Sequence, residues 1–311
     1  MTAVNSISKD LLAASGFFGA SHPLFGAFGI EMEDVAPDGV VMSMPCVADT
    51  CDSSGVLHRG AIATLMDTTC GLAIFIRLGD MRPIATIDLR VDFITMPGIN
   101  EAVYCKVVCF AIEGDMAYVR GEAFGRSGGD VLASVSGSFA IGTLGPSFDK
   151  PIAKEKDNKK DVPKEETGEV GPGIRTEAPV SHNVLSDKSP YSKFLGIWLG
   201  NNDGVKTYEM SFRDKHVGNP LIKTFHGGIL ASFAEIVAGS YLTSNNAIND
   251  KTVCSSMTFD YLRPAFAGTL RAEPRIIREG RRFIIVVVDL FIEKNKVSQG
   301  RFIYKRALET I

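Results

Sequence analysis

Residues 58–76 read HRGAIATLMDTTCGLAIFI, and residues 226–243 read HGGILASFAEIVAGSYLT. Each stretch starts with a histidine that has a glycine two residues later, and continues as an apolar segment in which Asp67 or Glu235 is the only acid. A helix that is apolar on nearly all sides is a buried one. A carboxylate inside such a helix is costly unless it has partners. The sequence therefore predicts two buried helices, each with one acid at the same register.

These helices belong to a longer internal repeat. Asp67 and Glu235 are 168 residues apart, and the same offset relates residues 58 and 226, 71 and 239, 92 and 260, and 93 and 261. The offset holds without an insertion over both segments. Two similar units commonly pack on each other about a two-fold axis. We therefore expect the chain to be a pseudo-dimer of two copies of one domain.

Both copies predict the same order of elements. The helices are expected at 60–78 and 227–243, each after one strand, at 40–44 or 205–212. Four strands follow each helix, at 85–93, 103–110, 116–124 and 131–141 in the first copy and at 253–261, 270–277, 283–292 and 297–304 in the second. One long helix laid on a five-stranded, mainly antiparallel sheet is an α+β unit.

A charged segment separates the two copies. Residues 150–166 read KPIAKEKDNKKDVPKEE, with six lysines and five acids, which cannot form a core. The length of 311 residues fits two domains of roughly 150 residues each. We predict an N-terminal arm at 1–21, a first domain at 22–145, a flexible linker at 146–180 and a second domain at 181–311.

Composition excludes several classes of protein. With 45% hydrophobic and 22% charged residues, the chain has enough apolar material for packed cores. A net charge of −3 argues against a nucleic-acid partner. Apolar runs are interrupted before they reach the ~18 residues of a membrane helix. The N-terminal residues show no basic segment followed by an apolar one, so we expect no signal peptide. The six cysteines have no metal-ligand spacing. We expect a cytoplasmic protein with reduced thiols, without a metal or a membrane partner.

The start of each helix is a candidate site for polarising a carbonyl group. Free backbone N–H groups and the helix dipole favour negative charge there. Arg59 and Asp67 are eight residues apart, or about 12 Å along a helix at ~1.5 Å per residue. Donor and acid from one copy therefore cannot act on the same atom. Donor from one copy and acid from the other can, which predicts two composite sites between the domains.

Both copies resemble a known family in these same motifs. The matching segments are residues 55–61 (GVLHRGA), 65–67 (LMD) and 86–93 (TIDLRVDF), and then 225–231 (FHGGILA), 234–235 (AE) and 259–264 (FDYLRP). They resemble the PaaI-like hotdog thioesterases of the phenylacetate pathway. The resemblance implies two tandem hotdog domains, each a long helix wrapped by its sheet. It also implies hydrolysis of an acyl-CoA to free CoA and a carboxylic acid, without a cofactor, and further pairing into a homodimer of the tandem chain.

The resemblance implies a role for individual residues. Asp67 and Glu235 fall on the position of the catalytic acid. Arg59 and Gly227 fall on the position whose backbone N–H polarises the thioester carbonyl. Thr86 falls on a hydroxyl position that assists the acid. We assign substrate-binding roles to the residues around them: His58, Arg59, Gly60, His226, Gly228, Asn219 and Asp52.

The first composite site, called site A, joins Asp67 and Thr86 to residues 226–228 (HGG). Family members place an asparagine or glutamine six residues before the histidine. Here that position is Pro220, so Asn219 would need a one-residue shift to orient the water. The second site, called site B, joins Glu235 to residues 58–60 (HRG).

Site B departs further from the pattern. Arginine replaces glycine at the donor, which is penalised if that position needs a positive φ. Cys254 stands where the first copy has Thr86. Asp52 stands at the asparagine or glutamine position, and if it faced Glu235 the two carboxylates would raise one pKa. We therefore favour site A as the active one, with two active sites as the main alternative.

Several alternatives stay open at this point. His58 and His226 either brace the helix start or act directly. Asp67 either activates a water or attacks to form a mixed anhydride. A non-catalytic acyl-CoA-binding or sensing protein is the alternative function, since a fold does not fix an activity. A hotdog hydratase would use another His/Asp arrangement. The length and the aryl or alkyl nature of the acyl group are not determined by the sequence.

Overall fold

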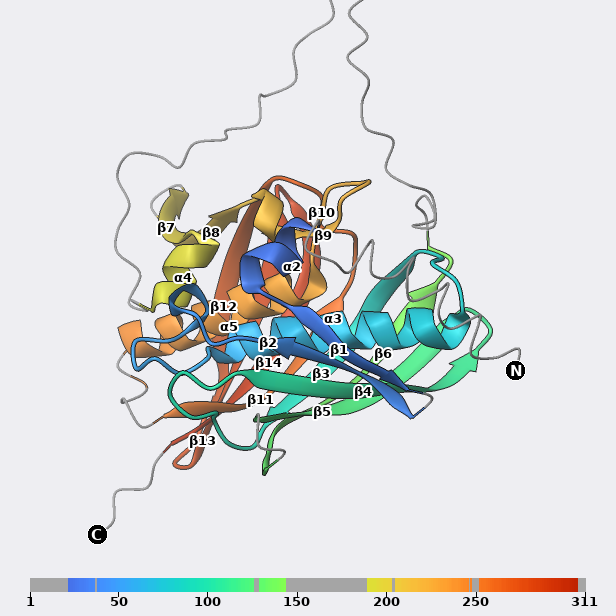
Figure 1. Ribbon diagram of the computed structural model, residues 1–311. Helices are drawn as coiled ribbons and strands as arrows, with labels where there is room; N and C mark the ends of the chain where they lie inside the picture. The colour runs from blue at the N-terminus through green and yellow to red at the C-terminus, as the bar shows by residue number, and fades with distance from the viewer. Residues whose placement is uncertain are drawn as a thin grey trace, which may run out of the picture.

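The computed structural model describes residues 22–36, 38–125, 129–143, 189–202, 205–245, 247 and 252–306. The arm predicted at 1–21 and the linker predicted at 146–180 lie outside the described residues, so the predicted domain boundaries stay predictions. The chain on either side of that linker forms one structure (Figure 1).

A single twelve-stranded antiparallel sheet runs through both copies. Its order is β1-β2-β4-β5-β6-β3-β11-β14-β13-β12-β8-β7, so each copy supplies one half. The first copy contributes β1 (Glu31–Ala36), β2 (Gly39–Met44), β3 (Ile84–Phe93), β4 (Val103–Glu113), β5 (Met116–Gly125) and β6 (Val131–Ile141). The second contributes β7 (Ile197–Asn202), β8 (Val205–Ser211), β11 (Val253–Tyr261), β12 (Thr269–Glu279), β13 (Phe283–Ile292) and β14 (Asn295–Lys305).

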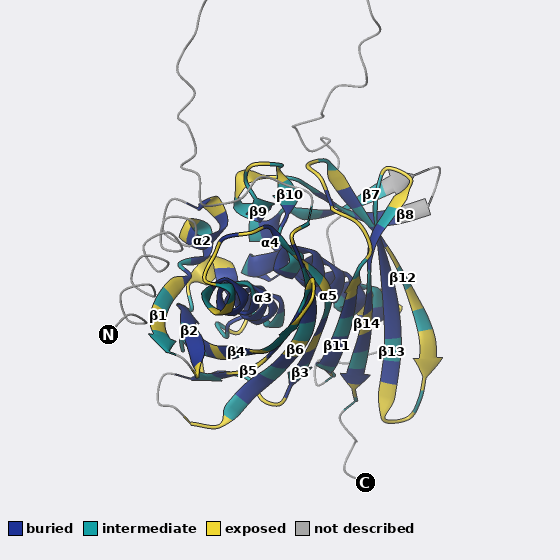
Figure 2. Cartoon of the chain, turned by 90° about the vertical axis from the view of Figure 1, so that its right-hand side faces the viewer, coloured by how far each residue is buried: buried dark blue, intermediate teal, exposed yellow. Residues whose placement is uncertain are grey.

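Two long helices lie inside the curved sheet. They are α3 (Arg59–Leu78) and α5 (Gly227–Ser244), within two residues of the ranges expected from the sequence. Figure 2 looks along α3 and shows β1 to β6 curving around it. α3 has the length and apolar composition of a membrane span, but it is mostly buried within the molecule, as the core helix of a folded domain is. The predicted tandem hotdog fold is confirmed.

The pseudo-two-fold axis can be located from pairs of residues that are 168 positions apart. On the central strands β3 and β11, Arg90 lies opposite Thr258 in antiparallel register. Between the two long helices, the hydroxyl groups of Thr64 and Ser232 are 3.0 Å apart. A residue that meets its own equivalent lies on the axis. Residues that are 168 positions apart in the sequence are therefore related by the pseudo-two-fold axis of the fold.

In the large sheet, the prediction of five strands per copy is too low by one. The strands that it omits there, β1 and β7, lie at the two outer edges, and in the second copy it also omits the short β9 and β10. β1 reads EMEDVA, and its side chains are exposed or half-buried along its whole length, so it lacks the alternating apolar pattern of a half-buried strand. β7 reads IWLGNN, an apolar run of only three residues.

Smaller elements complete the interface between the copies. They are the short helices α2 (Pro23–Phe28) and α4 (Pro190–Leu195) and the two-stranded sheet of β9 (Val217–Asn219) and β10 (Thr224–Phe225). The His22 ring, just before α2, hydrogen-bonds the Gly218 carbonyl of the other copy at 3.3 Å. The Tyr191 amide in α4 likewise donates to the Cys51 carbonyl at 3.2 Å. Each copy thus closes over the loop that precedes the long helix of the other.

Candidate active site

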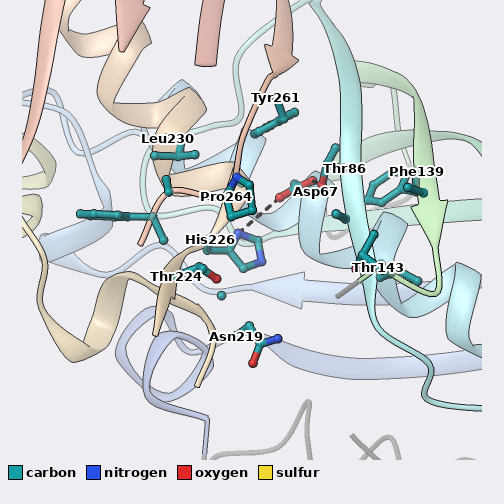
Figure 3. A pocket seen from close by; sticks show the side chains of 18 of the residues that line it. Asp67, Thr86, Phe139, Thr143, Asn219, Thr224, His226, Leu230, Tyr261 and Pro264 are labelled. Carbon is teal, nitrogen blue, oxygen red and sulfur yellow. Dashed lines mark hydrogen bonds and ion pairs between the residues drawn. The ribbon is translucent and has the colours of Figure 1, made fainter. Parts of the chain in front are cut away.

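Site A borders a cavity of about 510 Å³ between the two copies. α2, α3, β3 and β6 of the first copy and β9, β10, α5 and the end of β11 of the second form its walls. The walls are mostly apolar, and Asp67 and Arg263 are the charged residues among the described ones that line them. Figure 3 shows Thr86 beside Asp67, and a dashed line that joins Asp67 to His226. A small polar group with an apolar extension would fit such a cavity.

Asp67 is held by contacts from both copies. The Gly228 N–H, at the start of α5, donates to Asp67 Oδ2 at 2.7 Å. The Thr86 hydroxyl on β3 donates to Asp67 Oδ1 at 3.2 Å. His226 Nδ1 lies 3.3 Å from Asp67 Oδ2. The acid of one copy thus meets the glycine-rich helix start of the other, as the spacing along each helix predicted.

The environment shifts the protonation of this group. Burial raises the pKa of Asp67 to about 6, against the opposing effect of the hydrogen bonds from Gly228 and Thr86. A carboxylate with this pKa is mostly ionised at neutral pH, yet it accepts a proton more readily than an ordinary aspartate does. These are the properties of a general base.

His226 makes the bracing hydrogen bond that the sequence analysis considered for it. Burial lowers its pKa to about 4, so the ring is neutral near pH 7. Its Nδ1 accepts a hydrogen bond from the Gly228 N–H at 3.0 Å and caps the helix. The proton therefore belongs on Nε2, which lies 3.4 Å from the Thr68 hydroxyl. His58 caps α3 in the same way, through the Gly60 N–H at 3.0 Å.

Gly227 lets the Asp67 carboxylate approach the start of α5 closely. A Cβ atom on Gly227 would lie 2.7 Å from Asp67 Oδ2, so a larger residue would intrude on the carboxylate. As the first residue of α5, Gly227 has an N–H that cannot bond within the helix. None of the described residues accepts a hydrogen bond from it. An acceptor atom of a ligand could therefore bond this N–H beside Asp67.

Site B has the same plan with a looser contact. His58 Nδ1 lies 3.9 Å from Glu235 Oε2. The Arg59 guanidinium lies 6.0 Å from the centre of the Phe93 ring, and its buried Nε has no hydrogen-bond partner among the described residues. Neither Arg59 nor Gly227 has a positive φ, so the backbone penalty considered for arginine does not arise. Arginine instead fills space beside the donor position. Cys254 is buried, and burial, with Glu235 adding to it, raises its pKa.

The pKa of Asp52 is set by burial and by its own loop, and Glu235 is not among the groups that shift it. Its Oδ1 accepts hydrogen bonds from the Ser54 N–H at 2.8 Å, the Ser54 hydroxyl at 2.6 Å and the Val56 N–H at 3.2 Å. Burial acts to raise the pKa of Asp52, but these hydrogen bonds outweigh it, and the pKa is lowered. The pKa of Asp52 is thus lowered because its own loop supplies the donors, and the raised pKa considered for a facing Asp52–Glu235 pair stays a prediction.

Asn219 makes a similar turn at site A. Its Oδ1 accepts from the Leu221 N–H at 3.0 Å, two residues on, as Asp52 does from Ser54. Its side chain lines the cavity, below His226 in Figure 3. The structure therefore brings Asn219, Asp67, Thr86, His226 and Gly227 to one cavity, and Gly228 bonds Asp67 at its wall. Arg59, Gly60, His58 and Glu235 gather at the other helix start.

Sequence reasoning missed most of the cavity wall. The missed residues are apolar or aromatic side chains at separate points of the chain, among them Phe25, Phe75, Phe139, Leu230 and Tyr261. Of these, only Tyr261 could have been found from the sequence. It replaces Phe93 of the first copy at the 168-residue offset, and the two residues differ only by a hydroxyl group. Within the described residues, no group of three or more His, Cys, Asp and Glu side chains could hold a metal ion.

Comparison with known structures agrees with this architecture. A structure with a hotdog fold from Alicyclobacillus acidocaldarius, of unknown function, superposes with a TM-score of 0.61 at 12% identity over 93% of this chain and all of that one. Acyl-CoA thioesterase II from Mycobacterium marinum gives a TM-score of 0.54 at 12% identity over 90% of this chain and 96% of its own. At these identities the likeness concerns the fold.

Sequence comparison adds the family. A Saccharolobus solfataricus protein provisionally named an esterase is 27% identical over 112 residues, which are 35% of this chain and 71% of that protein. The family model described as the thioesterase superfamily matches twice, at residues 54–132 and 223–299. Each match contains one long helix, its acid and the glycine-rich start. The chain therefore belongs to the thioesterase superfamily, as a tandem hotdog protein.

Proposed function

We propose that the chain hydrolyses acyl-CoA thioesters at site A, to free CoA and a carboxylic acid. One observation carries the proposal: a buried carboxylate of one copy is hydrogen-bonded to the helix start of the other, at the wall of an apolar cavity. The cavity would hold the acyl group, and the helix start would polarise its carbonyl. Membership of the thioesterase superfamily supports this chemistry.

The reaction follows from the arrangement of these groups. The thioester oxygen accepts a hydrogen bond from the Gly227 N–H, which leaves its carbon open to attack beside Asp67. On one route Asp67 takes a proton from water, the hydroxide attacks the carbon, the C–S bond breaks and the CoA sulfur receives the proton. On the other route Asp67 attacks the carbon itself, CoA leaves, and water hydrolyses the anhydride. Thr86 holds the carboxylate in place on both routes.

A thiol-release assay tests the proposal. The purified chain would be incubated with acyl-CoAs from acetyl to palmitoyl, together with benzoyl-CoA and phenylacetyl-CoA, and free CoA followed with a disulfide dye. Because the chain's own cysteines are mostly buried, the signal would come from CoA. We expect turnover with at least one substrate. Binding without turnover of any of them would instead support the acyl-CoA-binding alternative.

The pH profile is the second expected result. Only ionised Asp67 can accept a proton or attack, and burial raises its pKa from 3.8 to about 6. We therefore expect kcat/KM to rise with pH through about 6 and to level off above it. Thr86→Val removes a hydrogen bond that lowers this pKa, and its profile should be shifted to higher pH. A profile that is flat through this region in both proteins would exclude Asp67 as the base.

The assembly and location expected from the sequence remain part of the proposal. Homodimers of the tandem chain would have twice its mass of 33.5 kDa, which light scattering on the purified protein measures directly. A mass of one chain at micromolar concentration would contradict the dimer without affecting site A, because both halves of site A come from one chain. We place the protein in the cytoplasm, where acyl-CoA is available to it.

A further inference from the structure

Tyr261 presents a buried hydroxyl group that the mechanism above does not use. It is the last residue of β11, and its side chain lines the cavity of site A (Figure 3). The residue is half-buried as a whole, but its hydroxyl oxygen is fully buried and has no hydrogen-bond partner among the described residues. A buried polar group without a partner destabilises the fold. Buried tyrosine hydroxyls usually have one, so this group is suited to a ligand.

The hydroxyl end of the ring borders the reacting groups. Tyr261 Cε1 and Cζ lie 3.1 and 3.3 Å from the point where a Cβ on Gly227 would stand. Asp67 Oδ2 lies 2.7 Å from that same point. The carboxylate and the phenol ring therefore both approach Gly227 closely, at the same point of the helix start. Burial, together with the nearby Asp67 carboxylate, raises the pKa of Tyr261, so the phenol keeps its proton and can donate.

The other copy provides an internal comparison. Its equivalent residue is Phe93, which lies at the end of β3 and below the Arg59 guanidinium at site B. The fold thus accepts a plain phenyl ring at this position. The hydroxyl of Tyr261 is present only beside the favoured site, where it has nothing to bond within the described chain.

We propose that Tyr261 donates a hydrogen bond to the carbonyl oxygen of the acyl thioester in site A, as a second donor beside the Gly227 N–H. This inference rests on the proposed function. Negative charge develops on that oxygen as the tetrahedral intermediate forms, so the donor acts more strongly in the transition state than on the bound substrate. Loss of the hydroxyl should therefore lower kcat and leave KM nearly unchanged. We expect about a 10- to 100-fold decrease, at or below the effect of losing one oxyanion donor.

Tyr261→Phe tests this, because it removes one oxygen atom and restores the residue of the first copy. The expected result is a lower kcat, a similar KM and a melting temperature equal to or above that of the wild type, since no hydrogen bond within the protein is lost. The matched control is Tyr208→Phe on β8, which removes a phenol that is hydrogen-bonded to Ser244. That variant should melt at a lower temperature and keep its kcat.

The outcomes separate this inference from the proposed function. An active wild type and a Tyr261→Phe variant with the same kcat would overturn the inference alone. A raised KM at constant kcat would also overturn it, since the hydroxyl would then bind substrate and transition state equally. A lower melting temperature with unchanged kcat would give Tyr261 a structural role. A wild type inactive on every acyl-CoA would overturn the proposed function itself.

Discussion

Replacing Asp67 with asparagine is expected to lower kcat/KM for thioester hydrolysis by about 10²–10⁴-fold, the usual contribution of a general base. Asparagine has nearly the same shape, and its carbonyl oxygen can still accept the hydrogen bond that Gly228 donates. It can neither take a proton from water nor attack the thioester carbon. Steady-state thiol release across a range of substrate concentrations, at a pH well above 6, measures the loss.

The same variant should be at least as stable as the wild type. The folded-state pKa of Asp67 is about 6, above the ordinary value of 3.8, so the folded protein binds this proton more tightly than the unfolded chain does. The stability that this provides is fully present below pH 3.8 and is lost as the pH rises through about 6. Asparagine does not ionise and does not incur that loss. The melting temperature of Asp67→Asn relative to wild type should therefore increase between pH 5 and pH 8.

Glu235→Gln is the matched control, since it makes the equivalent change in the other copy. Its contact to His58 is 3.9 Å long, against 3.3 Å from His226 to Asp67. At the donor position, Arg59 also carries a long side chain where the equivalent Gly227 has none. We expect Glu235→Gln to keep most of its turnover. An equal loss in both variants would show that the two sites work together, and a loss only in Glu235→Gln would move the activity to site B.

The sequence predicted the features that depend on residues close together in the chain. Helix length and the positions of the two acids follow from apolar residues that are consecutive in sequence. The cross-copy contact of Asp67 followed because the distance along one helix is fixed by its geometry. The pseudo-two-fold axis followed from the constant offset, because equivalent residues of two packed copies are related by that axis. Arg90 and Thr258 are such a pair, and they lie opposite each other.

What the sequence did not predict depends on which neighbours the folded chain brings to a residue. β1 has a polar composition and is a strand because β2 offers it a free edge. The Asp52 pKa depends on which donors its loop folds toward the carboxylate, and these are Ser54 and Val56. Tyr261 looked like an ordinary repeat position until the structure placed its ring beside Gly227. In each case the deciding contact depends on the folded backbone and not on the composition of the segment.

Replacing Gly228 with alanine is expected to destabilise the fold by about 3 kcal/mol, at the upper end for an overpacked core position. A Cβ there would lie 2.5 Å from Thr64 Cα, which is backbone of the other long helix and cannot move aside as a side chain could. α3 and α5 would have to separate at their closest approach, beside the hydroxyl pair of Thr64 and Ser232. The shift would also draw the Gly228 N–H away from Asp67, so activity should fall as well. Chemical denaturation and thiol release measure the two effects.

Gly239→Ala in the same helix is the control that separates packing from helix chemistry. A Cβ on Gly239 would meet only the Tyr304 hydroxyl, at the ordinary distance of 3.5 Å. Alanine in a helix interior is more favourable than glycine by about 0.5–1 kcal/mol, so this variant should be slightly more stable than the wild type and fully active. The same substitution thus changes stability in opposite directions at two positions of α5. Equal stability of the two variants would mean that α3 and α5 do not pack this closely at Gly228. The composite site would then lose its basis, because Asp67 reaches Gly228 only through this close packing.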